Sequence, residues 1–184
     1  IWKGDLESDV GKALLAGDDD GPTIMMVVNM VLDPAAGPVA IGRLFSGTIK
    51  DGQTLHIIDE KREGRVQSVN FFMGNQREQV GELGAGNIPA LLGLTECRAG
   101  NTLSSIKDIP MFEGVKYVSE PVVQIAIEPK HPKDLPKLVD ILRQLTIEDP
   151  NLVVKIDEES GETIVAGMGV LHLDVATHRI QDAK

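Results

Sequence analysis

The 184-residue chain is predicted to fold as a small closed β barrel followed by an α+β unit. Residues 22–110 are a succession of β-branched and apolar runs separated by turn signals, with no helical pattern between them. After residue 120, strand and amphipathic helix patterns follow one another in the order βαββα. Hydrophobic residues make up 42% of the sequence, which is enough for a sizeable core and excludes a disordered chain.

The first 21 residues are expected to be a connector. Val10 and Leu14 give weak helical spacing, which ends at the three aspartates 18–20 and at Gly21-Pro22. Adjacent carboxylates without Asn/Asp alternation or a downstream glutamate do not match a calcium loop. We therefore interpret the three aspartates as a solvated loop.

The barrel prediction for residues 22–110 depends on strands such as "TIMMVVNMVLD", "VAIGRLFSGTIK" and "RVQSVNFFM". Asp51-Gly52 is a hairpin turn signal, and Gly42 and Gly47 suit sharp bends within a strand. Six or more strands without an intervening helix favour closure, because a barrel has no exposed sheet edges.

Residues 111–119 are expected to link the barrel to the second unit, residues 120–184. In this unit "PVVQIAIE" is a strand with Val123, Ile125 and Ile127 on one face. The run "KDLPKLVDILRQLTIED" is an amphipathic helix with a core-facing leucine stripe, which Pro150 ends. The stripe contains Leu135, Leu138, Leu142 and Leu145, with Val139 beside them.

A hairpin with the turn "EESG" and a second helix, "VLHLDVATHRI", complete the βαββα order. We expect Leu171, Val175 and His178 on one stripe of this helix, with Leu173, Ala176 and Ile180 beside it. A ferredoxin-like split βαβ unit needs one more strand, so the domain is expected to lack its last strand. Because Ile1 replaces an initiator methionine, we interpret the chain as a fragment of a longer protein.

The net charge of −10 is unevenly distributed. Residues 1–21 carry two basic and six acidic groups (−4), residues 22–110 eight and nine (−1), and residues 111–184 eight and thirteen (−5). The nearly neutral middle segment excludes a broad basic binding face, but its "DEKREGRV" run can make a local phosphate contact. The basic residues of this run are Lys61, Arg62 and Arg65. The alternative is a solvated hairpin tip.

The stretch "GETIVAGMGVLHLDV" places two glycines between a strand and a helix. A dinucleotide fingerprint would need a third glycine where His172 stands, and a Gly-Lys-Ser/Thr phosphate loop is absent throughout. Gly167 and Gly169 let the backbone reverse tightly, while Met168 points into the core or toward a neighbouring domain. We therefore expect an interdomain hinge at Gly167, Met168, Gly169 and His172. If the glycines hold backbone angles closed to other residues, valine at either one should cost about 1–3 kcal/mol.

No residue pattern indicates catalysis, a cofactor or a metal site. Cys97 is alone, so it forms no internal disulfide and nothing suggests secretion, and it has no evident base beside it. The four histidines lack the spacing of metal ligands, and the acidic "DEES" run at residues 157–160 is interpreted as a hairpin turn. No apolar run approaches the roughly 20 residues of a membrane-spanning helix.

The glycine stretch resembles the domain III signature of the ribosomal translocases, the elongation factor G and elongation factor 2 family, usually written G-M-G-E-L-H-L-E/D. Val170 stands where many members carry glutamate, so no polar role is assigned to it. The runs "GRLFSGTIKDGQTL" and "GNIPALLGLTECRAGNTL" resemble domain II of translational GTPases, and "EPVVQIAIEPKHPKDLPKLVDILRQLTIEDPNL" is similar to domain III. The resemblance covers essentially the whole chain, and its short barrel loops look archaeal.

This resemblance implies a domain II barrel and a ferredoxin-like domain III from a cytoplasmic GTPase that moves transfer and messenger RNA through the ribosome. Domain II would contact small-subunit ribosomal RNA, with Lys61, Arg62 and Arg65 as candidates, and domain III would relay the nucleotide state. GTP and magnesium would bind in a GTPase domain preceding residue 1, so the fragment itself would be no enzyme. The implied partners are the ribosome and the parent's GTPase and C-terminal domains, with no membrane. The alternatives are a release or assembly GTPase and a metabolic enzyme fragment.

Overall fold

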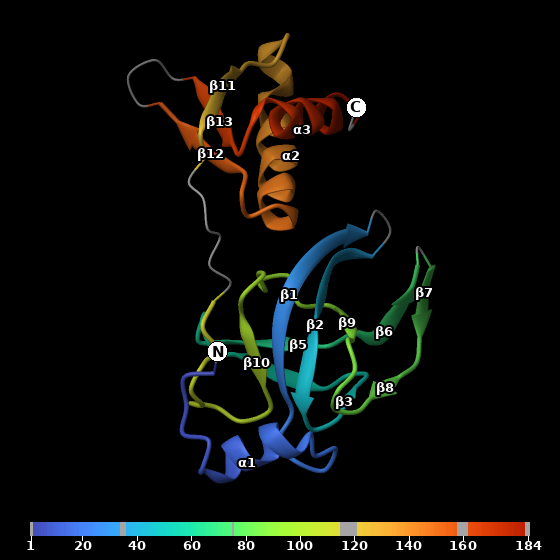
Figure 1. Cartoon of the computed structure of the whole chain (residues 1–184). Helices are drawn as coiled ribbons and strands as arrows, with labels where there is room; N and C mark the ends of the chain where they lie inside the picture. Colours follow the sequence, from blue (N-terminus) through green and yellow to red (C-terminus); the bar gives the residue numbers. More distant parts are fainter. Residues whose placement is uncertain (1, 34–35, 75, 115–120, 158–161, 183–184) are drawn as a thin grey trace. The chain divides into compact units, whose positions relative to one another are not determined.

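The computed structural model describes residues 2–33, 36–74, 76–114, 121–157 and 162–182. It divides the chain into two compact units, Ile1–Val115 and Lys116–Lys184 (Figure 1). The division falls within the segment 111–119 that the sequence predicts as a linker, of which residues 115–119 lie outside the described part. Each unit has a hydrophobic core of its own.

The first unit is built from antiparallel strands and one helix. Its elements are α1 (Asp9–Ala16), β1 (Ile24–Asp33), β2 (Gly37–Ser46), β3 (Ile49–Lys50), β4 (Thr54–Ile57), β5 (Arg62–Arg65), β6 (Ser68–Met73), β7 (Gln76–Gln79), β8 (Glu82–Leu83), β9 (Ala90–Leu92) and β10 (Thr102–Ser104). Eight strands pair in the order β5-β4-β10-β1-β2-β9-β6-β7, and β3 pairs separately with β8.

The barrel closes because β5 and β6 are two halves of one bent strand. β5 pairs with β4 at one end of the strand order, β6 pairs with β9 near the other end, and Val66 and Gln67 alone separate them. The Val66 N–H donates to the Gln53 carbonyl at 2.8 Å, and the Gln67 N–H donates to the Leu92 carbonyl at 2.8 Å. Hydrogen bonding to both neighbouring strands therefore continues across the bend, which closes the sheet on itself while β7 stays at an edge. The predicted closed barrel is confirmed.

A bulge in β1 keeps its core residues pointing inward. Val27 pairs with Gly42 and Asn29 pairs with Ile41, so Val28 has no partner in the ladder. Val27 and Met30 are buried, whereas Val28 between them is 53% exposed. The extra residue shifts the inward–outward alternation of β1 by one position, so that Met30 points into the core as Val27 does. Gly42 on β2 lets the two strands approach closely at this bulge.

The turn at Asp51-Gly52 forms, but it does not make the predicted hairpin. Gly52 has φ +79°, a left-handed backbone angle that glycine adopts easily. The strands on either side of the turn do not pair with each other, because β3 pairs with β8 and β4 pairs with β5 and β10. The Asp51 carboxylate accepts hydrogen bonds from the Val69 N–H at 2.5 Å and from Gln79 Nε2 at 2.9 Å. The turn is thus a corner of the barrel, held by a side chain that bonds to β6 and β7 in place of a ladder.

The first 21 residues, expected to form a connector, pack on the barrel within the first unit. Ser8 caps α1 by accepting the Gly11 N–H at 3.0 Å, and the helix packs Val10 and Leu14 against the barrel core. Asp19, expected to lie in a solvated loop, is exposed but accepts the Ala85 N–H at 2.6 Å. The aspartate run therefore anchors the helix to the barrel.

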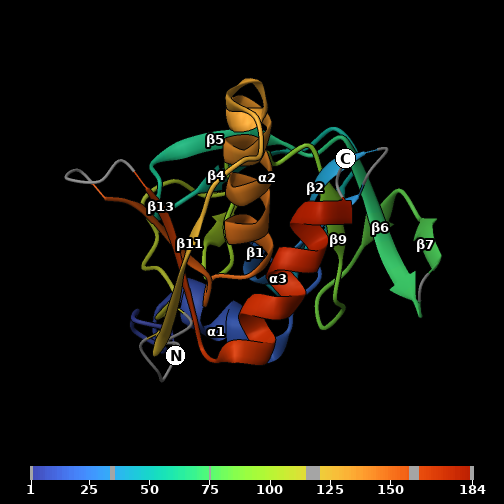
Figure 2. The same cartoon turned by 90° about the horizontal axis from the view of Figure 1, so that it is seen from above.

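The second unit is a three-stranded antiparallel sheet with both helices on one face (Figure 2). Its elements are β11 (Val123–Ile127), the 3-10 helix η1 (Pro132–Asp134), α2 (Leu135–Glu148), β12 (Val153–Ile156), β13 (Thr163–Gly167) and α3 (Val170–Asp182). The strand order is β11-β13-β12, so β11 and β12 are the edges. This is the predicted βαββα arrangement, while the predicted "EESG" turn at 158–161 and most of the "DEES" run lie outside the described residues.

The two predicted helical stripes are only partly core. Leu138, Leu142 and Leu145 are buried against Val165 and Leu173. The predicted core positions 135 and 139 are instead 47% and 40% exposed on α2. On α3, the stripe of residues 171, 175 and 178 faces outward, because the helix turns its neighbouring stripe to the sheet.

Replacing Gly42 by alanine is expected to lower the free energy of unfolding by about 2–3 kcal/mol, because the added Cβ would overlap the Met26 carbonyl group across the β1–β2 bulge. Gly114→Ala is the control, since a Cβ there meets no atom within 4 Å. Urea unfolding of both variants checks this, and equal midpoints would show that the barrel tolerates wider strand spacing at the bulge.

Candidate functional site: the turn after β13

The predicted hinge residues form one turn that joins β13 to α3. β13 ends at Gly167 and α3 begins at Val170, so Met168 and Gly169 alone connect the strand to the helix. The Gly169 carbonyl accepts the Leu173 N–H at 3.2 Å, which is the first hydrogen bond of α3. The reversal is therefore as short as the sequence pattern predicts.

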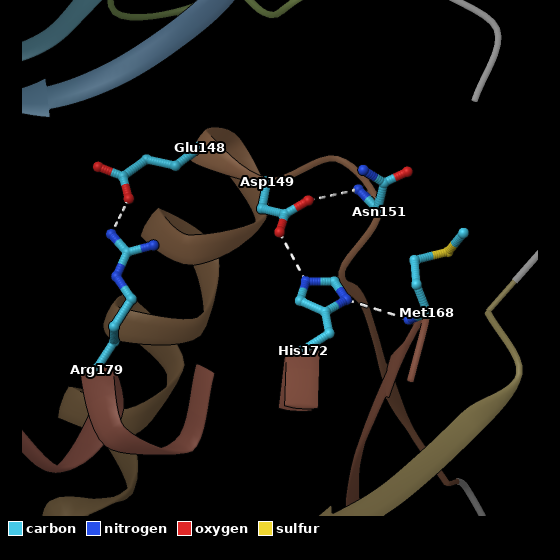
Figure 3. A network of polar contacts seen from close by, with 6 residues as sticks. All are labelled: Glu148, Asp149, Asn151, Met168, His172 and Arg179. Atoms are coloured by element: carbon cyan, nitrogen blue, oxygen red, sulfur yellow. Dashed lines mark hydrogen bonds and ion pairs between the residues drawn. The ribbon is translucent and has the colours of Figure 1, made fainter. Parts of the chain in front are cut away.

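His172 ties this turn to the end of α2 (Figure 3). Its Nδ1 accepts the Met168 N–H at 3.1 Å, and its Nε2 lies 2.7 Å from Asp149 Oδ2. Because Nδ1 is the acceptor, the neutral ring carries its proton on Nε2, which donates to the carboxylate. The histidine is an internal brace of the second unit.

Asp149 is the partner that sequence reasoning missed. It follows the last residue of α2, where its N–H donates to the Leu145 carbonyl at 2.8 Å. Its Oδ1 accepts the Asn151 N–H at 3.0 Å, so one carboxylate serves both the turn after α2 and His172 (Figure 3). The Asp-Pro pair at the helix end is the available sequence signal, because Asp commonly caps turns there.

Arg179 and Glu148 form a second link between the two helices (Figure 3). Glu148 is the last residue of α2, and Arg179 lies in the last turns of α3. The ends of the two helices are thus joined by charge as well as by packing.

The two glycines have different surroundings, and neither is required by its backbone angle. Neither Gly167 nor Gly169 lies in the left-handed region of backbone conformation, so the expectation of an angle closed to other residues is wrong. At Gly167 a Cβ would lie 2.9 Å from Leu173 Cδ2 and 3.0 Å from His172 Nδ1. At Gly169 a Cβ would meet nothing within 4 Å. Close packing therefore explains Gly167, whereas nothing in the described residues requires glycine at 169.

The geometry of the turn suits contact with a partner rather than chemistry. The Met168 N–H, which a phosphate loop would offer to an anion, is already bonded to His172. Directly after the turn, Val170 and Leu171 are 66% and 77% exposed. The turn therefore has no free N–H at Met168 and presents two apolar side chains to solvent directly after it.

The three basic candidates lie on the β4–β5 hairpin, but they do not act together. Arg62 Nη1 is 2.5 Å from Glu96 Oε2, and this hydrogen bond and charge raise the pKa of the guanidinium. Arg65 Nε donates to the Gly52 carbonyl at 3.2 Å. Lys61 is exposed in a left-handed conformation, with φ 52°.

A groove of about 680 Å³ lies beside Lys61 and Arg62, and Arg65 is outside it. Its charged lining residues are Lys61, Arg62, Lys107, Glu63, Glu96 and Asp108. Three basic and three acidic side chains make the groove neutral overall. It can therefore offer single phosphate contacts but no continuous basic surface for a nucleic-acid backbone.

Among the described residues, no three His, Cys, Asp or Glu side chains are placed to hold a metal ion. Within the same part of the chain, no helix is long and apolar enough to cross a membrane. Burial raises the pKa of the Cys97 thiol to about 12, so the thiol stays protonated and is a poor nucleophile at neutral pH.

Comparisons with known proteins agree with this architecture. The family model for Elongation factor G domain 2 matches residues 22–106, and that for Elongation Factor G, domain III, matches residues 118–184. The chain is 86% identical over its full length to Elongation factor 2 of Cenarchaeum symbiosum. It belongs to the elongation factor 2 family.

Two further similar proteins share less of their sequence with this chain. Elongation factor 2 of Sulfurisphaera tokodaii is 50% identical over 99% of this chain. A crystal structure of a Thermus thermophilus protein matches 89% of the chain with a TM-score of 0.74 and 31% identity, over 25% of its own length. The chain spans 25% of the length of the two archaeal factors.

Gly167→Ala is expected to lower the free energy of unfolding by about 1–3 kcal/mol, because Leu173 and His172 must shift to admit a Cβ. Gly169→Ala should change it by less than about 0.5 kcal/mol. Thermal unfolding of the two variants checks the difference. If both lost the same stability, steric closeness at Gly167 would not be the reason for its glycine.

The Cys97 thiol is expected to resist a thiol reagent at pH 8 in the folded chain and to react fully in denaturant. The pKa of the thiol in the folded chain is about 12, above the ordinary value of 9.0. The contribution of the protonated thiol to the free energy of unfolding is therefore complete below pH 9 and is lost as the pH rises toward 12. A colorimetric thiol assay with and without urea measures the reactivity. Rapid labelling of the folded chain would contradict the burial of Cys97.

Proposed function

We propose that this chain is domain II and most of domain III of an archaeal-type elongation factor 2. The parent is a cytoplasmic GTPase that moves transfer and messenger RNA through the ribosome, and this part supplies ribosome contacts and passes the nucleotide state between domains. The observation that carries the proposal is the 86% identity over the whole chain to an archaeal Elongation factor 2. In this assignment residues 1–21 join a GTPase domain to the barrel, and residues 111–119 join domain II to domain III.

The architecture supports a relay better than a catalytic role. The turn at Gly167–Gly169 is fixed internally by His172, while Val170 and Leu171 are exposed beside it. A neighbouring domain that binds there would meet a surface whose angle is set by α2, α3 and the sheet together. This is the basis on which we assign the turn to an interdomain contact in the parent.

The residues of this chain do not fit GTP or magnesium. The sequence has no Gly-Lys-Ser/Thr phosphate loop. In the glycine turn, the Met168 N–H is already hydrogen-bonded to His172. We therefore assign both ligands to the parent's GTPase domain and expect this segment alone to bind no nucleotide.

Contacts with small-subunit ribosomal RNA are assigned to the barrel. Lys61 and Arg65 have cationic ends outside ion pairs within the described residues, whereas Arg62 is held by Glu96. Because the groove beside the hairpin is neutral overall, each contact should be a single phosphate interaction.

The test uses the full-length factor with Gly169→Val. Valine has open space within this chain, so the melting temperature should stay within about 2 °C of the parent value. If the turn contacts another domain, movement of messenger RNA by one codon should slow at least fivefold. Thr54→Val, an exposed change on β4, is the matched control. Unchanged movement in both variants would refute the interdomain role, and a parent factor inactive in ribosome-dependent GTP hydrolysis would refute the proposed function.

A further inference from the structure

The chain enters and leaves the first unit at one place. Trp2 and Phe112 form an antiparallel β-bridge across 110 positions of the sequence. The Lys3 N–H donates to the Met111 carbonyl at 3.2 Å, and the indole Nε1–H of Trp2 donates to the Pro110 carbonyl at 2.7 Å. We call these contacts, between residues 2–3 and 110–112, the clamp.

The departing side of the clamp is fixed to the barrel. Phe112 is 6% exposed, and its N–H donates to Thr102 Oγ1 at 2.9 Å. Its ring stacks on Phe45 with centroids 4.8 Å apart. Thr102 is fully buried on β10, so the backbone at Phe112 is held from two sides.

The arriving side is held by the departing side and by the barrel core. Trp2 is only half-buried, and the hydrogen bond of its indole is made to Pro110. Gly4 lies against the indole, where a Cβ would overlap the ring. Trp2 packs against the cluster of Ile24, Ile109 and Phe112, and its directional indole bond fixes the arriving segment to the departing one.

We infer that Trp2 is a positioning residue that couples the segment preceding the barrel to the segment leading to the second unit. The inference rests on the proposed function, in which a GTPase domain lies ahead of Trp2 and domain III follows the linker. A displacement of the segment before Trp2 reaches residues 110–112 through the hydrogen bonds of the clamp, which join the two segments directly. Through the clamp, movement of the nucleotide domain displaces the segment that leads to domain III.

The test compares two steps in the full-length factor: ribosome-dependent GTP hydrolysis and the single-turnover movement of messenger RNA. Trp2→Ala removes the indole hydrogen bond and the packing of the ring, while the backbone bridge can still form. We expect hydrolysis within twofold of the parent rate and movement at least tenfold slower. Val69→Ala, which truncates a fully buried barrel residue away from the clamp, controls for general loosening and should leave the ratio of the two rates unchanged.

A reversible cross-link separates coupling from packing. The bridge places Lys3 opposite Met111, both are exposed, and directly opposed residues of an antiparallel pair have the spacing of a disulfide. In the Trp2→Ala background, Lys3→Cys with Met111→Cys should restore movement at least fivefold when oxidised and lose it again on reduction. The native Cys97 is buried and should not interfere.

The outcomes divide clearly. Equal slowing of hydrolysis and movement by Trp2→Ala, the same ratio change in Val69→Ala, or no recovery on oxidation would each overturn the clamp as a coupling device. A parent factor that hydrolyses GTP and moves messenger RNA would keep the proposed function in all three cases. A parent that does neither would instead refute the proposed function, and the inference with it.

Discussion

The close approach of α3 to the end of β13 is the constraint on which the second unit depends. Leu173 packs so near Gly167 that a Cβ there would lie 2.9 Å from Leu173 Cδ2, so any larger residue requires Leu173 to shift. This contact brings the first turn of α3 next to the end of α2, where His172 can reach Asp149. The sheet, both helices and the turn are held together by this steric contact, by the His172–Asp149 contact and by the Arg179–Glu148 ion pair, in addition to their shared core.

The fold could be predicted from the sequence because its signals are periodic. Strand runs bounded by glycine and proline indicated a barrel, and Leu138, Leu142 and Leu145 indicated the buried side of α2. The width of each apolar stripe was harder to predict, because period alone does not show how much surface a neighbouring element covers. Leu135 and Leu171 match the helical pattern and still face outward.

The candidate site could be located but not explained from the sequence. The two glycines marked the turn, yet a glycine chosen for close packing and a glycine with open space around it look the same in a sequence. Asp149 was missed because its role depends on His172, which is 23 positions away. The ion pair of Arg62 with Glu96 likewise joins segments that only the barrel brings together, and it removed one of three candidate cations. Contacts of this kind follow from tertiary structure, which residue spacing does not encode.

The strand order of the second unit has a consequence for how the chain behaves by itself. β11 pairs with β13 on one side only, so within the described residues its other side presents unpaired N–H and carbonyl groups. Val122, beside this strand, is 74% exposed. Such an edge is a template on which another extended segment can add by backbone hydrogen bonding. Charged or proline substitutions on β11 would block such pairing.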